Sequence, residues 1–199
     1  GASLATVCGY ALQQSLTGLE FAWGIPGSIG GAAFMNAGAY GEEMKDVVLS
    51  CTHMNPDGTI ETFTAEQLDF AYRHSVYQKS HGIVLSVTFQ LQKGDKQEIK
   101  AKMDDLMGRR KEKQPLEYPS AGSVFKRPVG YFAGTMIEQC GLKGKTVGGA
   151  MVSPKHAGFI VNTGDATCQD VLDLIALIQT TVKEQTGIML ECEIRAIGG

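Results

Sequence analysis

A glycine-rich stretch restricts what this chain can fold into more than any other segment does. Residues 19–41 read LEFAWGIPGSIGGAAFMNAGAYG. So many glycines weaken regular structure unless the backbone needs left-handed dihedrals or close approach to another group. Successive amide N–H groups in such turns form a concave anion site suited to a diphosphate. A structural turn without a ligand is the alternative. Neither GxGxxG after a strand nor GxxxxGK is present, which excludes the dinucleotide fingerprint and the P-loop.

Composition limits the remaining function classes. The 199 residues are 43% hydrophobic and 20% charged, with a formal net charge of −3. Such a chain builds one sizeable core or two small ones and lacks the basic character of a nucleic-acid binder. No apolar run reaches the ~20 residues that span a bilayer, and residues 1–12 carry no basic signal-peptide start. We therefore expect a soluble protein with no membrane partner. Because Gly1 replaces an initiator Met, we expect the natural start upstream.

The cysteines and histidines indicate neither disulfides nor a metal. The five cysteines are odd in number, widely spaced and without a CxxC pair, which favours reduced, mostly buried thiols in a cytosolic protein. The four histidines show no ligand spacing, so we expect no metal site. The cysteines are Cys8, Cys51, Cys140, Cys168 and Cys192, and the histidines are His53, His74, His81 and His156.

The first half of the chain alternates between helical and strand patterns. Apolar residues recur at helical spacing over 3–16, and Gly18 is the expected stop. Strands are expected over 47–54 and 59–63, joined by the turn at 55–58, and Thr64 with Gln67 forms a capping box. A third strand over 83–91 places its odd-numbered apolar residues on one face. A helix follows over 97–113, and its terminal charge run, 109–113, reads as a solvated face.

The second half begins after a linker at 115–122. There we expect a short strand near Val124, a helix over 131–140, and strands over 147–152 and 159–161. A long helix capped near Thr167 runs to Thr186, and a last strand covers 188–197. Strands and helices alternate without repeats, which predicts an α+β fold in two units, residues 1–115 and 120–199.

Several motifs in order resemble one enzyme family. GIPGSIGGAAFMNAGAYG at 24–41 looks like the flavin-binding signature of the UDP-N-acetylenolpyruvoylglucosamine reductases. The blocks FAYRHS at 70–75, AGSVFKRP at 121–128 and LECEIRAIG at 190–198 follow in the family's order. GLKG at 141–144 and SPKHAGFIVN at 153–162 lie between the last two. The resemblance therefore covers the whole chain.

The family resemblance implies a fold, a reaction and two cofactors. Residues 1–115 would be the C-terminal part of an FAD-binding domain whose other half precedes Gly1, and residues 120–199 a smaller substrate-binding domain. NADPH would reduce FAD, and the flavin would reduce the enolpyruvyl group of a UDP-sugar for peptidoglycan synthesis in the bacterial cytoplasm. We expect a monomer. The implied cofactor-binding residues are Gly24, Ile25, Pro26, Gly27, Ser28, Ile29, Gly30, Gly31, Asn36, Gly38, Ala39 and Tyr40.

Three residues match the family's catalytic positions. Arg73 would hold the substrate carboxylate, because a guanidinium stays charged and offers a planar fork; alone, it reads as a surface residue. Ser123 would deliver a proton to the substrate carbanion, and otherwise it caps a turn. Glu193 would share the enol proton, with Glu191 in reserve. Alternation over 188–197 puts both glutamates and Arg195 on one face, which without the motif would be solvated.

A negatively charged chain needs local positive charge to hold a diphosphate and a carboxylate. The residues that the resemblance places near the substrate are Tyr72, Lys126, Arg127, Tyr131, Lys143 and His156, with Lys155 a further cation. His156 reads equally well as a structural histidine. Arg127-Pro128 and the abrupt turn at Gly94-Asp95 match the family's shorter subgroup, which lacks a tyrosine-bearing loop. Tyr131 is then the nearest aromatic candidate to cover the substrate in place of that tyrosine.

Two other functions fit parts of the same sequence. A different flavin oxidoreductase of the same architecture would lack the combination of Arg73, Ser123 and Glu193. A catalytically silent UDP-sugar-binding module would keep the second unit's residues without a functional flavin site. Bound yellow flavin separates these readings.

Overall fold

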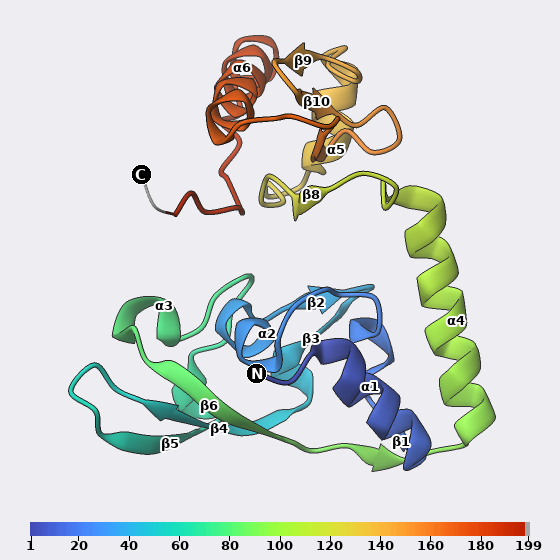
Figure 1. Ribbon diagram of the computed structural model, residues 1–199, viewed down its shortest axis with the longest axis vertical. Coiled ribbons are helices and arrows are strands. Elements are labelled where there is room, and N and C mark those ends of the chain that lie inside the picture. Colours follow the sequence, from blue (N-terminus) through green and yellow to red (C-terminus); the bar gives the residue numbers. More distant parts are fainter. Residues whose placement is uncertain (198–199) are drawn as a thin grey trace. The chain divides into compact units, whose positions relative to one another are not determined.

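The computed structural model describes residues 1–197, and Gly198, the last residue of the predicted LECEIRAIG motif, lies outside them. The chain divides into two compact units, Gly1–Arg110 and Lys111–Gly199 (Figure 1). Each unit combines helices with antiparallel sheet, so the predicted α+β class is confirmed.

The first unit contains a three-stranded antiparallel sheet in the order β5-β4-β6. β4 (Val48–Met54) and β5 (Ile60–Thr64) form the predicted hairpin, whose turn Asn55 closes by donating its N–H to the carbonyl of Thr59. β6 (Ile83–Phe89) pairs with the other edge of β4. Two short antiparallel pairs complete the unit: β1 (Leu16–Thr17) with β7 (Gln92–Lys93), and β2 (Gly38–Ala39) with β3 (Glu42–Glu43).

The helices of the first unit begin with α1 (Leu4–Gln13), which is capped by the Ser3 hydroxyl. α1 ends before the predicted stop at Gly18, because Ser15 adopts a left-handed φ of 55° and turns the chain into β1. The capping pattern at Thr64 opens only a 3-10 turn, η3. The other elements are α2 (Ile29–Met35), α3 (Tyr77–Ser80), α4 (Lys96–Lys113), η1 (Glu20–Ala22), η2 (Met44–Asp46) and η3 (Glu66–Leu68).

Two expectations for the first unit are wrong. Leu85 is an extra residue in β6, because Thr52 pairs with Ser86 and His53 with Val84. This bulge reverses the alternation, so Val84 packs on the core while Leu85 stays 52% exposed. Arg110 is the second: it is only 9% exposed, although it belongs to a charge run predicted to face solvent. It continues the buried face of α4 formed by Ile99, Met103 and Leu106.

The second unit is built on a four-stranded antiparallel sheet in the order β8-β11-β10-β9. Its strands are β8 (Ser120–Ser123), β9 (Thr146–Val147), β10 (Ala150–Val152) and β11 (Phe159–Asn162). The helices α5 (Ala133–Gln139) and α6 (Cys168–Thr186) lie with this sheet in the same unit (Figure 1). α6 confirms its prediction: the Thr167 side chain and Asp170 form a capping box, and Gly187 ends the helix in a left-handed conformation.

Two predicted strands of the second unit are also wrong. The strand expected over 147–152 is a tight hairpin, because Gly148 has a φ of 50° and separates β9 from β10. The segment 188–197 is not a strand, and its one isolated bridge joins Cys192 to Phe125. One reason is that the side-chain amide of Gln179 donates a hydrogen bond to the Leu190 carbonyl, where a neighbouring strand would otherwise donate.

The cysteines are less buried as a group than predicted. Cys8 and Cys51 are buried, and burial raises the pKa of the Cys8 thiol to about 12 and that of Cys51 to about 11. Cys168, the first residue of α6, is exposed. Over residues 1–197, no helix is both long enough and apolar enough to cross a membrane.

Candidate functional site

The glycine-rich stretch folds around a short helix that the sequence did not predict. Ser28 caps the N-terminus of α2, and its hydroxyl accepts the N–H of Gly31 at 3.1 Å. The N–H of Ile29 bonds to the carbonyl of Ala2 at 3.0 Å, so part of the predicted amide cradle is already used. Gly27 precedes it with a φ of 128°, and no atom lies within 4 Å of the position a Cβ would take. The backbone at Gly27 thus requires glycine and is open to a ligand.

Both ends of the glycine-rich stretch contact one turn of α4. A Cβ on Gly24 would lie 2.7 Å from Nε of Arg110, so glycine is needed there for close approach. At the other end, the Tyr40 hydroxyl donates to the carbonyl of Leu106 at 3.0 Å. Residues 106–110 of α4 therefore contact the stretch at both Gly24 and Tyr40. The only sequence signal for this role of Arg110 is its helical spacing from Ile99.

Asn36 fixes the shape of the stretch from within. It ends α2 in a left-handed conformation and is fully buried. Its side-chain amide donates to the Glu43 carboxylate and to the carbonyl of Ala71, both at 2.9 Å, and its oxygen accepts the N–H of Lys45. Asn36 therefore fixes the conformation of the loop that follows α2.

Arg73 stands in a strained turn beside this stretch. Ala71 and His74 exchange backbone hydrogen bonds, which closes a two-residue turn at Tyr72 and Arg73. Arg73 has a φ of 52°, a costly conformation for a long side chain. Its Nη2 donates to the carbonyl of Gly38 at 3.2 Å, and its guanidinium lies 5.0 Å from the ring centroid of Tyr72. The turn therefore points the guanidinium at the glycine-rich stretch.

Ser123 and Glu193 are neighbours in the second unit. Ser123 ends β8 and pairs with Phe159 of β11, and its hydroxyl is 3.4 Å from the carbonyl of Phe125. The N–H of Glu193 donates to the carbonyl of Val124 at 2.8 Å. Glu193, the predicted carboxylate, therefore lies opposite Val124, the residue that follows the predicted proton donor Ser123, where the two segments pair antiparallel. Arg73 belongs to the first unit, so this pair is what the structure itself brings together.

The reserve glutamate has a different partner. Glu191 is 72% exposed and forms an ion pair with Lys126, whose N–H also donates to the Glu191 carbonyl. Glu193 is less exposed than Glu191 and lies closer along the pair to Ser123. Of the two, Glu193 is the residue whose backbone lies nearer to Ser123.

His156 lies between glycines close to Ser123. Its Nδ1 accepts the N–H of Gly158 at 3.1 Å, and its ring packs edge-on against Phe159. A Cβ on Gly158 would lie 3.0 Å from the imidazole and 3.6 Å from the Ser123 hydroxyl. Burial lowers the pKa of His156 below its usual value of 6.5, and the Lys143 ammonium lowers it further. His156 is therefore neutral near pH 7.

The remaining predicted substrate residues are distributed over the second unit and the turn of Arg73. Lys143 pairs with Glu138 at 2.6 Å, and Lys155 approaches Glu117 at 3.6 Å. The Arg127 guanidinium lies 3.9 Å from the ring centroid of Phe132, while Tyr131 is 52% exposed. Phe132 was not among the predicted site residues, because the sequence places it in a helix over 131–140, whereas α5 begins only at Ala133.

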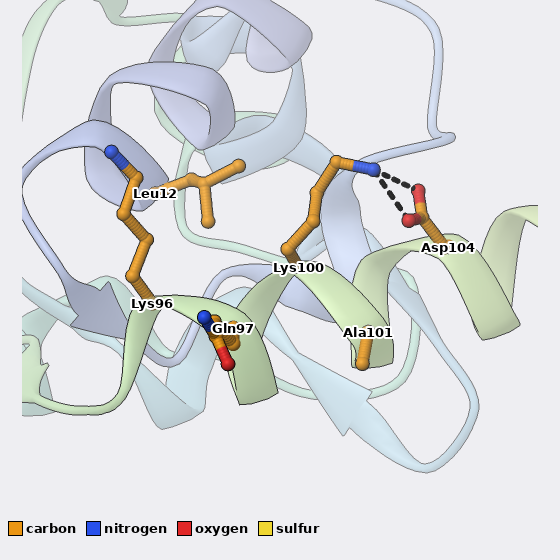
Figure 2. A pocket seen from close by; sticks show the side chains of 6 residues that line it. All are labelled: Leu12, Lys96, Gln97, Lys100, Ala101 and Asp104. Carbon is orange, nitrogen blue, oxygen red and sulfur yellow. Dashed lines mark hydrogen bonds and ion pairs between the residues drawn. The ribbon is translucent and has the colours of Figure 1, made fainter.

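A depression of about 500 Å³ lies elsewhere in the first unit, between α1 and α4 (Figure 2). None of the predicted site residues lines it. Within the described 197 residues, no group of three or more histidine, cysteine or acidic side chains is arranged to hold a metal ion. The lining residues are Leu12, Lys96, Gln97, Lys100, Ala101 and Asp104.

Parts of both units match known protein families. Residues 1–64 match the sequence model of an FAD binding domain, and residues 114–197 match that of the UDP-N-acetylenolpyruvoylglucosamine reductase C-terminal domain. Reductases of that name from Limosilactobacillus reuteri and Enterococcus faecalis are 59% and 57% identical over 198 residues. The chain spans 66% of the length of each. The crystal structure of UDP-N-acetylenolpyruvylglucosamine reductase (MurB) from Thermus caldophilus superimposes with a TM-score of 0.86 at 38% identity, covering 97% of this chain and 69% of that one.

These matches define a class, an FAD-binding-type domain followed by a reductase C-terminal domain. More narrowly, the chain belongs to the UDP-N-acetylenolpyruvoylglucosamine reductase family.

Proposed function

We propose that the whole protein reduces the enolpyruvyl group of UDP-N-acetylglucosamine enolpyruvate to UDP-N-acetylmuramate, a step of peptidoglycan synthesis, with NADPH as electron donor and FAD as carrier. The observation that carries the proposal is the antiparallel pairing of Glu193 with Val124, which brings the Glu193 backbone next to the segment that contains Ser123. The names of the relatives agree with this chemistry. A monomeric, cytoplasmic enzyme is part of the proposal, in which residues 1–115 bind the flavin and residues 120–199 bind the substrate.

The glycine-rich stretch has features that fit FAD. Gly27 exposes a backbone without a side chain, as a bulky diphosphate or ring requires for close approach. The proposed binding wall is residues 24–31, continued by residues 36–40, and the contacts of Arg110 and Tyr40 with α4 keep it in shape. When bound, FAD would take a hydride from NADPH and supply it to the substrate double bond.

Arg73 would stabilise the charge that develops when the hydride adds. As the hydride bonds to the terminal carbon, the π electrons move to the carbon beside the carboxylate and give an enolate-like species. A guanidinium with a planar fork of donors can hold that carboxylate throughout. The bond from Arg73 to Gly38 and the strained turn fix the fork before substrate arrives.

Ser123 would then complete the reaction by protonating that carbon. A hydroxyl is a weak acid, so the transfer needs a strongly basic carbon and a nearby group that restrains the alkoxide. Glu193 lies within the same antiparallel pair and would share the enol proton. Solvent restores the proton to Ser123, so each cycle consumes one NADPH and one proton.

Turnover of the full-length protein tests this proposal. Purified protein should show the visible absorption of bound flavin and oxidise NADPH only when UDP-N-acetylglucosamine enolpyruvate is present, with one sugar reduced per NADPH. Oxidation of NADPH with no dependence on the sugar would identify a different flavin oxidoreductase. Colourless protein that still binds the UDP-sugar would identify a silent binding module.

A further inference from the structure

The strained turn that carries Arg73 is supported by groups outside the turn itself. Its own backbone bonds join Ala71 to His74 and do not involve the Arg73 carbonyl. Arg73 nevertheless keeps a φ of 52°. A long side chain stays in that region only where the surrounding structure over-determines the conformation. The contacts of Arg73 with neighbouring elements therefore decide where its guanidinium lies.

Gln78 supplies one of these contacts to the Arg73 backbone. Its side-chain Nε2 donates to the Arg73 carbonyl at 2.8 Å. The same nitrogen lies 3.4 Å from the carbonyl of Phe34 and 3.9 Å from Sδ of Met35, the last two residues of α2. An amide nitrogen has two N–H donors, so one side chain can join the Arg73 carbonyl to the end of α2.

The residues on both sides of Arg73 are tied to the same end of α2. The Phe34 carbonyl lies in the last turn of that helix, where carbonyls lack an intrahelical partner. The hydroxyl of Ser75, which is fully buried, donates to this carbonyl at 2.7 Å. Before the turn, the Asn36 side chain donates to the Ala71 carbonyl at 2.9 Å. The turn is therefore fastened to the glycine-rich stretch, which contains α2.

Gln78 extends from an anchored element. It is the second residue of α3, and the first, Tyr77, is fully buried. Just before α3, the N–H of Val76 bonds to the Leu68 carbonyl at 2.8 Å. Gln78 itself is half-buried. Its amide can therefore hold the turn in one place, because the helix that carries it is fixed on the core.

We propose that Gln78 is a positioning residue for reduction of the enolpyruvyl group. It holds the Arg73 turn against the end of α2 and so sets the guanidinium beside the glycine-rich stretch. The proposal rests on the proposed function, in which Arg73 holds the substrate carboxylate. Loss of the Gln78 amide should therefore affect the half-reaction that uses Arg73, and not the reduction of FAD by NADPH.

Variants of the flavin-loaded, full-length protein test this role by rapid mixing. Gln78→Met has a similar length and no donor, and Gln78→Glu keeps the shape but cannot donate when ionised. Both should slow reoxidation of the reduced flavin by UDP-N-acetylglucosamine enolpyruvate about 2- to 12-fold, the factor that corresponds to one net hydrogen bond. Gln78→Lys keeps a donor and should regain most of the rate. Lys79→Met, at the exposed next position of α3, is the matched control and should behave as wild type.

A double-mutant cycle with Arg73 separates positioning from a general structural role. In an Arg73→Ala protein there is no guanidinium to place, so adding Gln78→Met should slow reoxidation little further. The same factor in both backgrounds would overturn the proposal, because Gln78 would then act independently of Arg73. Unchanged reoxidation in Gln78→Met, or equal slowing of both half-reactions, would overturn it as well.

A crystal structure of the Gln78→Met protein tests the geometry without relying on turnover. Arg73 should leave its left-handed φ, or its guanidinium should leave the Gly38 carbonyl. Retention of both features would overturn the positioning role, whatever the kinetics show. Wild-type reduced flavin that is not reoxidised by the enolpyruvyl sugar would instead contradict the proposed function, and the variant structure would still decide whether Gln78 holds the turn.

Discussion

The two units differ in which residues adopt left-handed backbone conformations. Among the described residues, every non-glycine residue with a left-handed φ lies in the first unit, and Asn36, Tyr40 and Arg73 all belong to its candidate site. In the second unit the left-handed positions are all glycine. The other strained residues of the first unit are Ser15, Asp69 and His81.

The difference shows two ways to fix a functional side chain. Strain of order 1–3 kcal/mol per residue persists only where neighbouring bonds over-determine the conformation, as those of Asn36 and Arg73 do. The second unit has no such non-glycine positions among its described residues and, as at Gly24 in the first unit, uses the missing side chains of glycines as room for other groups. His156 packs on Gly134 and Gly158, and the Asp170 carboxylate packs on Gly148.

The largest expected effect is on the carboxylate of the second unit. Glu193→Gln should slow reduction of the enolpyruvyl sugar about 10²–10⁴-fold, the range typical of acid–base groups, while flavin reduction by NADPH stays near wild type. Glu191→Gln is the matched control, because Glu191 pairs with Lys126 on an exposed surface. Single-turnover kinetics of the two half-reactions measure both. A larger loss in Glu191→Gln would reverse the assignment.

Arg73 tests whether strain in the first unit serves function. Arg73→Lys loses the planar fork and should lower turnover about 10- to 100-fold, since a hydrogen bond to a charged group contributes about 1.5–3 kcal/mol. Arg73→Gly relieves left-handed strain of about 1–2 kcal/mol, so its free energy of unfolding should not fall although turnover is lost. Urea unfolding measures the free energy of unfolding and steady-state kinetics measures turnover, so the two effects are separated. An Arg73→Gly protein that unfolds more easily would make Arg73 a structural residue.

Gly148 tests the packing of the second unit. Gly148→Ala combines a left-handed φ with a Cβ 2.4 Å from the Asp170 carboxylate, and should lower the free energy of unfolding by roughly 2–4 kcal/mol. Gly187→Ala is the control: its φ is 76°, and nothing lies within 4 Å of its Cβ position, so about 1 kcal/mol of strain is expected. Equal losses in thermal unfolding would show that close packing on Gly148 contributes nothing.

The smallest expected effect is the pH dependence that His156 gives the second unit. Its pKa is lowered by burial, so below its usual value of 6.5 the unfolded chain binds a proton that the folded unit resists. Stability should therefore fall as pH decreases from about 6.5 towards the folded pKa, and be unaffected by this group above that window. His156→Gln should remove this part of the slope. An NMR titration that gives His156 a pKa above 6.5 would contradict the burial argument.

Local signals predicted the elements whose ends are set by their own side chains. Thr167, Asp170 and Gly187 set the two ends of α6 through local capping. The turn at residues 55–58 likewise fixes the β4–β5 hairpin. Capping and turn chemistry act over a few residues, so a single sequence reveals them.

Features that depend on distant contacts were missed. The burial of Arg110 needs Gly24, which is far away in the sequence, and the bulge at Leu85 needs the pairing of β6 with β4. Segment 188–197 alternates like a strand, yet Gln179 occupies a backbone carbonyl that strand pairing would use. The family motifs predicted Arg73, Ser123 and Glu193, but only the structure shows that Glu193 pairs with Val124, the residue after Ser123. The contact of Phe132 with Arg127 likewise has no motif signal.

Rapid mixing of Ser123→Ala protein tests the central claim most directly. Reduction of its flavin by NADPH should proceed as in wild type, while reoxidation of the reduced flavin by UDP-N-acetylglucosamine enolpyruvate should be slowed by about 10²–10⁴-fold, because the hydroxyl that we propose as the proton donor is gone. Equal slowing of both steps, or reoxidation at the wild-type rate, would show that Ser123 is not the proton donor.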